Sequence, residues 1–265
     1  MTGAPPRLRA IPRRTLDAGG YLAFLVRVSG WRAAARAAWL MLRYAPAIVR
    51  SGSLQPIDPA MSRPPHSVRI NGVRTQWGHV NTGLWRDILL RHCYEPTAAF
   101  APSPGDTIVD LGANVGAFAI SAAVRMGSGR VIACEATPEE YAALLDNVAR
   151  NGVEAIVEPH FGLVGSGGVL QDSPTPVLDL DEALAGVPEI ALLKVDIEGS
   201  EFALFAAAGP WLDRVRRIAM EVHTVFGDPQ ALAALLVRRG FAVRTVPTTT
   251  LEGVYLYAER AGRRA

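Results

Sequence analysis

The sequence has little net charge, very little cysteine and almost no lysine. Its 265 residues include 27 Lys and Arg and 25 Asp and Glu, which gives a formal net charge of +2. A dedicated nucleic-acid binder usually has a stronger basic excess on one face, so we expect no nucleic-acid partner. Two cysteines, Cys93 and Cys134, are too few for a disulfide framework or a four-cysteine metal site. With no secretory-signal pattern at the start of the chain, we expect a cytoplasmic protein.

The chain also lacks a hydrophobic run long enough to suggest a membrane span. Residues 21–49 are rich in Ala, Leu, Val and Trp, but arginines interrupt them, whereas a span needs about 20 apolar residues with few charges. Four arginines fall on one side of a helix: Arg32, Arg36, Arg43 and Arg50. The segment is therefore an amphipathic helix, which Gly30 and Pro46 divide. Packing against the core or a second subunit is the favoured hypothesis, which includes a homodimer through this helix; a membrane-surface helix is the alternative.

Composition divides the chain into three parts. Residues 1–65 form an amphipathic helical segment and a linker, because 51–65 turn to Ser, Pro, Gly and Asp. Residues 66–104 are predicted to cover the main domain with a hairpin at Asn71-Gly72 and a helix over 85–94. The main domain is residues 105–265.

Short apolar runs alternate with helical patterns through the main domain. Strands are predicted at 107–111, 130–134, 155–159, 190–196, 215–222, 242–246 and 253–259. Helices are predicted at 117–125, 139–150, 179–185, 201–208 and 229–239. Continuous apolar runs are typical of buried parallel strands, and their alternation with helices favours a doubly wound α/β sheet. The two final strands follow each other closely, which places one antiparallel strand in an otherwise parallel sheet.

The strongest local motif is Asp110-Leu-Gly112-Ala-Asn114-Val-Gly116, directly after a strand and before a helix. Glycines at this point allow a sharp turn and a close approach to a ligand. The motif departs from the GxGxxG pattern of dinucleotide folds, and a carboxylate at Asp110 would repel a pyrophosphate. An acidic crevice suits a sulfonium instead, which favours S-adenosylmethionine over NAD.

An acidic residue also ends the next strand. Glu135 follows Gly116 at the distance at which a carboxylate can accept hydrogen bonds from both ribose hydroxyls of a nucleoside. A helix-capping role for Asp110 and a solvated loop position for Glu135 are the alternatives. The order and spacing of the two residues favour a cofactor site.

The single lysine of the chain, Lys194, lies in a third strand end. Side chains alternate along a strand, so Lys194, Asp196 and Glu198 are expected to lean the same way. Charges in an apolar run are costly unless they are paired, and a compact ammonium suits this position better than a guanidinium. The cluster is therefore predicted to be catalytic, with a buried ion pair that only fixes the strand as the alternative.

The same parity argument puts Glu221 and His223 on one side of the following strand end. His223 is the best candidate for a general base, because the ordinary pKa of histidine lies nearest neutrality. Asp196, Glu198, Glu221 and His223 could also ligate a divalent ion. Acid–base chemistry is the favoured interpretation, and no metal is expected.

Eight stretches, taken in order, resemble the FkbM-type family of S-adenosylmethionine-dependent methyltransferases. They are Tyr94-Glu95-Pro96, Pro104-Gly105-Asp106, Val109-Asp-Leu-Gly-Ala-Asn-Val-Gly116, Glu135-Ala-Thr-Pro138, Leu144-Leu-Asp-Asn147, Leu180-Asp181-Glu182, Leu193-Lys-Val-Asp-Ile-Glu-Gly-Ser-Glu201 and Glu221-Val-His223. The resemblance covers about two thirds of the chain, and the stretch that contains Lys194 is its most specific element. Ala136 stands where the family more often has proline.

This resemblance implies a Rossmann-like class I methyltransferase that uses S-adenosylmethionine. The implied reaction is O-methylation of a hydroxyl on a sugar or a small-molecule secondary metabolite. The expected cofactor-binding residues are Glu95, Asp110, Gly112, Asn114, Gly116, Glu135, Ala136 and Asp196. The expected catalytic residues are Lys194, Asp196, Glu198, Glu221 and His223. A non-catalytic cofactor-binding module and an NAD-dependent oxidoreductase are the alternatives.

Overall fold

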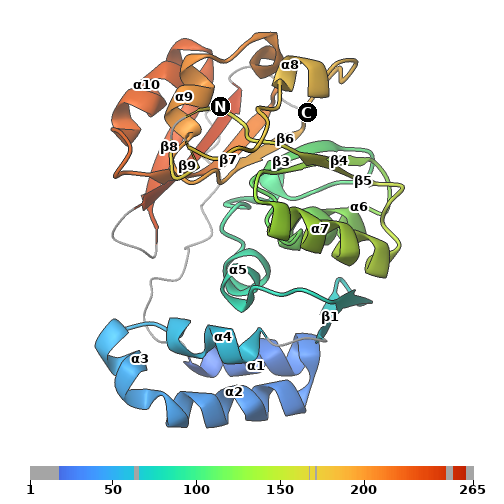
Figure 1. Ribbon diagram of the computed structural model, residues 1–265, viewed down its shortest axis with the longest axis vertical. Coiled ribbons are helices and arrows are strands. Elements are labelled where there is room, and N and C mark those ends of the chain that lie inside the picture. The colour runs from blue at the N-terminus through green and yellow to red at the C-terminus, as the bar shows by residue number, and fades with distance from the viewer. Residues whose placement is uncertain (1–17, 63–65, 167, 171, 249–252, 261–265) are drawn as a thin grey trace, which may run out of the picture.

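The computed structural model describes residues 18–62, 66–166, 168–170, 172–248 and 253–260. Figure 1 shows two parts, a layered α/β unit at one end of the molecule and a group of helices at the other. A hairpin and a short helix lie between them. The predicted site residues all belong to the α/β unit or to the segment that leads into it.

One sheet forms the centre of the α/β unit. Within the described residues it has seven strands in the order β5-β4-β3-β6-β7-β9-β8. Their bounds are β3 Thr107–Leu111, β4 Arg130–Glu135, β5 Val157–Phe161, β6 Leu192–Val195, β7 Arg217–His223, β8 Phe241–Pro247 and β9 Gly253–Arg260. β9 runs antiparallel to both of its neighbours, whereas β5, β4, β3, β6 and β7 are parallel. The predicted fold, a mostly parallel seven-stranded sheet with one antiparallel strand, is confirmed.

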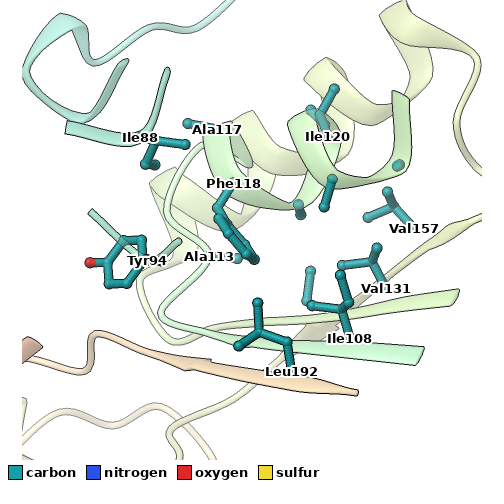
Figure 2. Close-up of a cluster of buried hydrophobic side chains, with 14 of the residues drawn as sticks. Ile88, Tyr94, Ile108, Ala113, Ala117, Phe118, Ile120, Val131, Val157 and Leu192 are labelled. Atoms are coloured by element: carbon teal, nitrogen blue, oxygen red, sulfur yellow. The ribbon is translucent and has the colours of Figure 1, made fainter. Parts of the chain in front are cut away.

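Helices cover both faces of this sheet (Figure 1). α6 (Ala117–Met126) and α7 (Pro138–Asn151) lie on one face, and α8 (Leu180–Ala183), α9 (Glu201–Ala206) and α10 (Pro229–Arg238) lie on the other. The strand side chains alternate between the two resulting cores, because successive residues of a strand point to opposite faces. Ile108 belongs to the α6 side and Val109 to the α10 side. Figure 2 shows the first of these cores, with Phe118 and Ile120 of α6 above the strands that carry Ile108 and Val131.

The predicted hairpin is present between β1 (His66–Ile70) and β2 (Val73–Trp77). Asn71 and Gly72 have φ angles of 49° and 82°, which is the pair of left-handed conformations that a two-residue type I′ turn requires. Buried Val68 and Trp77 join the core on the α6 side. The predicted helix over 85–94 starts earlier and is shorter, as α5 (Thr82–Trp85) followed by a π-helical turn, η2 (Arg86–Leu90).

The N-terminal helices form a core of their own. They are α1 Ala18–Ser29, α2 Trp31–Arg43, α3 Ala45–Ser51, the 3₁₀ turn η1 Gln55–Ile57 and α4 Asp58–Met61. Gly30, at φ 89°, separates α1 from α2, and Pro46 lies in the first turn of α3, so the predicted divisions hold. The expected linker over 51–65 is wrong as far as Ser62, because Ile57 and Met61 are buried among the helices; residues 63–65 lie outside the described residues. None of the described helices is long and apolar enough to cross a bilayer.

Candidate functional site

A cavity of about 380 Å³ lies at the carboxyl ends of β3, β4 and β6. Open α/β sheets bind their ligands at this edge, and a volume of about 300–1,000 Å³ is usual for small-molecule sites. The described residues that line it include five predicted cofactor residues, namely Gly112, Asn114, Glu135, Ala136 and Asp196. Lys194 and Glu198 line it as well.

The loop after β3 forms one wall of the cavity because its backbone lies against the end of β6. A Cβ atom at Gly112 would lie 1.7 Å from the carbonyl oxygen of Asp196, and its φ angle is 74°, so a larger residue does not fit. The amides of Gly112 and Ala113 both donate to the carbonyl of Cys134 at 2.9 Å. Gly112 therefore fixes the distance between the loop and the strand that carries Asp196.

Glu135 ends β4 at the cavity wall, and its carboxylate is held by three backbone amides. Its Oε2 accepts from Asn114 N at 2.7 Å, and its Oε1 accepts from the amides of Ala136 and Thr137 at 2.9 and 2.8 Å. Only 7% of the residue is exposed. Two carboxylate oxygens offer about four acceptor sites, so about one site is left for a donor of a ligand in the cavity.

Lys194 and Asp110 form a buried ion pair beneath the loop. Lys194 Nζ lies 3.0 Å from Asp110 Oδ1 and also donates to the carbonyls of Gly112 at 2.6 Å and Leu111 at 3.3 Å. Burial lowers the pKa of Lys194, but the charges of Asp110 and Asp196 outweigh it and raise the pKa above its usual value. The lysine therefore keeps its proton, donates hydrogen bonds to the two carbonyls and forms the ion pair with Asp110.

This ion pair changes the expectation for Asp110. The sequence argument placed its carboxylate in the crevice, but Asp110 is fully buried and lies outside the cavity wall that the described residues form. The reason is strand register, because Asp110 of β3 and Lys194 of β6 are direct cross-strand partners. The Lys194 ammonium contacts Asp110 and the carbonyls of Gly112 and Leu111, and these contacts give the lysine a structural role.

Glu95, Gly116 and Glu221 also lie outside the described cavity wall. Glu95 is buried and forms a bidentate ion pair with Arg125 of α6, which uses both of its oxygens. Gly116 is the residue before α6 and has a φ angle of 88°. Burial, followed by the charge of Asp196, raises the pKa of Glu221 to about 8.

Asp196, Glu198 and His223 meet at one end of the cavity, as the sequence predicted from their strand ends. Their potential ligand atoms all lie within 4.8 Å of one another. His223 Nε2 lies 3.3 Å from Glu198 Oε2, and Glu198 has a left-handed φ angle of 52°. Two carboxylates and an imidazole at this distance can exchange a proton with a ligand, and they are also residue types that hold divalent cations.

Glu201 stands behind His223 and controls its charge. Glu201 is fully buried, and its Oε1 lies 2.9 Å from His223 Nδ1. Burial lowers the pKa of His223, but the hydrogen bond and charge of Glu201, with the charges of Asp196 and Glu198, outweigh it. The pKa of His223 is thereby raised from 6.5 to about 9. At neutral pH the imidazole is therefore mostly protonated.

Sequence reasoning did not assign a role to Tyr94 or Glu201. The Tyr94 hydroxyl donates to Asp196 Oδ2 at 2.9 Å, and its ring packs edge-on against Phe118. Figure 2 shows the ring beside this apolar cluster, with the hydroxyl directed away from it. Both residues belong to the motifs that carry the family resemblance, so that resemblance was the available signal. The distances that give them their roles depend on packing across 102 and 22 residues of sequence.

Comparison with known proteins relates this arrangement to one family. The model of the FkbM methyltransferase domain matches residues 169–243, which include the whole Asp196, Glu198 and His223 cluster. The 31-O-demethyl-FK506 methyltransferase FkbM of Streptomyces tacrolimicus is 27% identical over 71% of this chain and 93% of its own length. Over these residues the chain is similar to the FkbM-type methyltransferases.

Other matches agree with the fold of this chain. The model of the TRM5/TYW2 methyltransferase domain matches residues 95–165, a stretch that contains Gly112 and Glu135. The ribosomal protein L11 methyltransferase of Vibrio cholerae is 34% identical, over 31% of this chain and 30% of its own length. The fibrillarin of Aeropyrum pernix, solved with natively bound S-adenosylmethionine, has a TM-score of 0.51. It is 17% identical and covers 74% of this chain and 83% of its own.

Proposed function

We propose that this protein transfers a methyl group to a hydroxyl of a small-molecule secondary metabolite or a sugar. The observation that carries the proposal is the triad of Asp196, Glu198 and His223 at the end of the cofactor cavity, with Glu201 behind the imidazole. A site that only bound the cofactor would not need such a cluster. The relative from Streptomyces tacrolimicus is named for an O-demethylated substrate, which supports oxygen as the acceptor atom.

The residues of the cavity fit S-adenosylmethionine. Glu135 lines the cavity with about one acceptor site left for a ribose hydroxyl. The loop from Gly112 to Asn114 lacks the GxGxxG spacing of pyrophosphate-binding loops. Ala136 and Asp196 complete this wall. When bound, the cofactor supplies an electrophilic methyl group. The chain supplies the walls that position the acceptor and exclude water.

His223 is the proposed general base. In its deprotonated form Nε2 accepts the proton of the acceptor hydroxyl, and the resulting imidazolium is stabilised by Glu198 at 3.3 Å and Glu201 at 2.9 Å. Glu201 also fixes the ring, because Nδ1 donates to its carboxylate. We therefore assign the cluster to proton transfer.

Asp196 is proposed to orient the acceptor hydroxyl. Asp196 lines the cavity, and the hydrogen bond from Tyr94 uses only its Oδ2, so Oδ1 is not used by that bond. The buried Tyr94 ring holds the carboxylate in place, because the ring packs against Phe118 and Tyr255. Glu221 lies outside the cavity wall, and Lys194 is held by its ion pair with Asp110. Neither residue is proposed to transfer a proton.

Replacing Glu135 with Ala is expected to weaken binding of S-adenosylhomocysteine by about 10- to 100-fold, the effect of losing hydrogen bonds to a charged acceptor. Titration calorimetry measures this directly, with NAD as the ligand control. Glu158→Ala is the matched control variant. Glu158 lies on the neighbouring strand β5, its carboxylate contacts Arg130 and His160, and it is outside the cavity wall. Equal affinity of Glu135→Ala and the wild type contradicts the ribose assignment.

The acceptor atom is tested with S-adenosylmethionine that carries an isotope-labelled methyl group. The enzyme is incubated with a panel of polyhydroxylated macrolides and sugars, and with amine-bearing analogues in which a hydroxyl is replaced. We expect label on oxygen, detected by mass spectrometry and nuclear magnetic resonance of the product. Label on the amine alone contradicts O-methylation, and label on neither contradicts the proposed acceptor class.

A further inference from the structure

The outward face of α2 is apolar, although a surface helix normally turns its polar face outward. At about 100° per residue, Trp31, Ala35, Trp39 and Leu42 fall within an arc of about 80°. Trp31, Trp39 and Leu42 are 69%, 62% and 79% exposed, whereas the opposite side of α2 packs against α1 through smaller residues. Val49 of the next helix, α3, is also 76% exposed. The remaining three tryptophans of the chain are buried.

Arginines lie beside this apolar surface. Arg32, Arg36 and Arg43 occupy the next arc of α2, and Arg50 lies beside Val49 on α3. The guanidinium of Arg32 packs over the Trp31 ring and that of Arg43 over the Tyr44 ring, at 5.6 and 5.7 Å. Residues 18–57 contain five arginines and no Asp or Glu. The face therefore combines exposed indole rings with an unbalanced positive charge.

We propose that this face, formed by Trp31, Trp39, Leu42, Val49 and their neighbouring arginines, docks the protein on an anionic lipid bilayer. Tryptophan and arginine are the residues that favour the bilayer interface, where indole rings enter the headgroup region and arginines reach lipid phosphates. Figure 1 shows α2 at the outer end of the molecule, farther from the sheet than α1 and α4, so a flat surface can approach it. The helix lies on the membrane and does not cross it.

Charge decides between a bilayer and a second copy of the chain. A two-fold interface brings the same patch of both copies together. Arginines from one copy would then face arginines from the other, with no carboxylate in residues 18–57 to balance them. An anionic bilayer supplies the missing charge and accepts the apolar side chains, so it satisfies both properties of the face.

Co-sedimentation with vesicles tests the proposal. The wild type is expected to bind vesicles of phosphatidylcholine with phosphatidylglycerol and not vesicles of phosphatidylcholine alone. The triple variants Arg32→Glu/Arg43→Glu/Arg50→Glu and Trp31→Ser/Trp39→Ser/Leu42→Ser should each reduce that binding by about tenfold or more. The charge control is Arg74→Glu/Arg238→Glu/Arg244→Glu, which changes three exposed arginines elsewhere. The apolar control is Val237→Ser on α10, and both controls should bind as the wild type does.

Each variant is first shown to keep its thermal shift with S-adenosylhomocysteine, because these positions lie far from the cavity wall. A wild type that stays in the supernatant with phosphatidylglycerol vesicles overturns the proposal. So does equal binding by all the variants. Light scattering tests for a dimer instead. A dimer that only the Trp31→Ser/Trp39→Ser/Leu42→Ser variant dissociates, with no vesicle binding by monomer or dimer, would overturn the proposal.

Discussion

His223→Ala is expected to lower kcat by about 100- to 10,000-fold, the usual contribution of a general base, while the affinity for S-adenosylhomocysteine stays unchanged. The reason is position, since His223 lies beside Asp196 and Glu198 but outside the described cavity wall. Turnover and calorimetry separate the two effects. His160→Ala is the matched control, because His160 also contacts a glutamate, Glu158, and both lie on β5, away from His223. Unchanged turnover of His223→Ala removes this residue from the mechanism.

The pH profile gives the same prediction a second readout. The pKa of His223 is raised to about 9, so the base form makes up about one molecule in a hundred at pH 7. We expect kcat to rise with pH up to about 9 and then level off. Glu201→Gln removes a carboxylate that stabilises the imidazolium, which lowers the pKa and moves the rise to lower pH. A profile that is flat in the wild type, or unmoved by Glu201→Gln, contradicts the assignment.

Lys194→Met is expected to destabilise the folded protein by about 3–5 kcal/mol, because it leaves the carboxylate of Asp110 buried without its cation. Thermal unfolding should show a loss of roughly 10 °C. Lys194→Arg should also destabilise, since Asp110, Gly112 and Leu111 all converge on one nitrogen and a planar guanidinium spreads its donors. This requirement accounts for a lone lysine among 26 arginines.

The double variant Lys194→Met/Asp110→Leu is the control for this ion pair. It removes both charges, and replacing a buried pair by apolar groups is often neutral or stabilising. We therefore expect it to recover most of the stability that Lys194→Met loses. A double variant that is as unstable as the single one would show that Lys194 acts mainly through the carbonyls of Gly112 and Leu111.

The fold was predictable because each level of the sequence gave the same answer. Buried parallel strands appear as apolar runs, and the strand at 107–111 and the helix at 229–239 agree with β3 and α10 to within one residue. The strand expected at 155–159 begins two residues later, since its start is set by pairing of Val157 with Val131 and not by local pattern. The end of the N-terminal segment was missed because short helices that pack through Ile57 resemble a loop in composition.

The site residues that lie at strand ends were predictable from the sequence. The contacts that depend on how two strands align were not. Asp196, Glu198 and His223 were expected together because they lie at neighbouring strand ends. Alternation along the strand is not the reason that they meet, because β6 ends at Val195. That Asp110 and Lys194 are cross-strand partners could not be inferred, because register is a property of two strands. The ion pair between Glu95 and Arg125 of α6 could not be inferred either, because it depends on how the segment before the sheet packs against that helix.

The two sides of the cavity come from separate stretches of the chain. Every group proposed to handle the proton lies between Asp196 and His223, whereas Asn81, Leu84 and Ile88, which line the cavity from before the sheet, belong to the covering segment. Substitutions in α5 and η2 would therefore change the shape of the cavity while leaving Asp196, Glu198 and His223 in place.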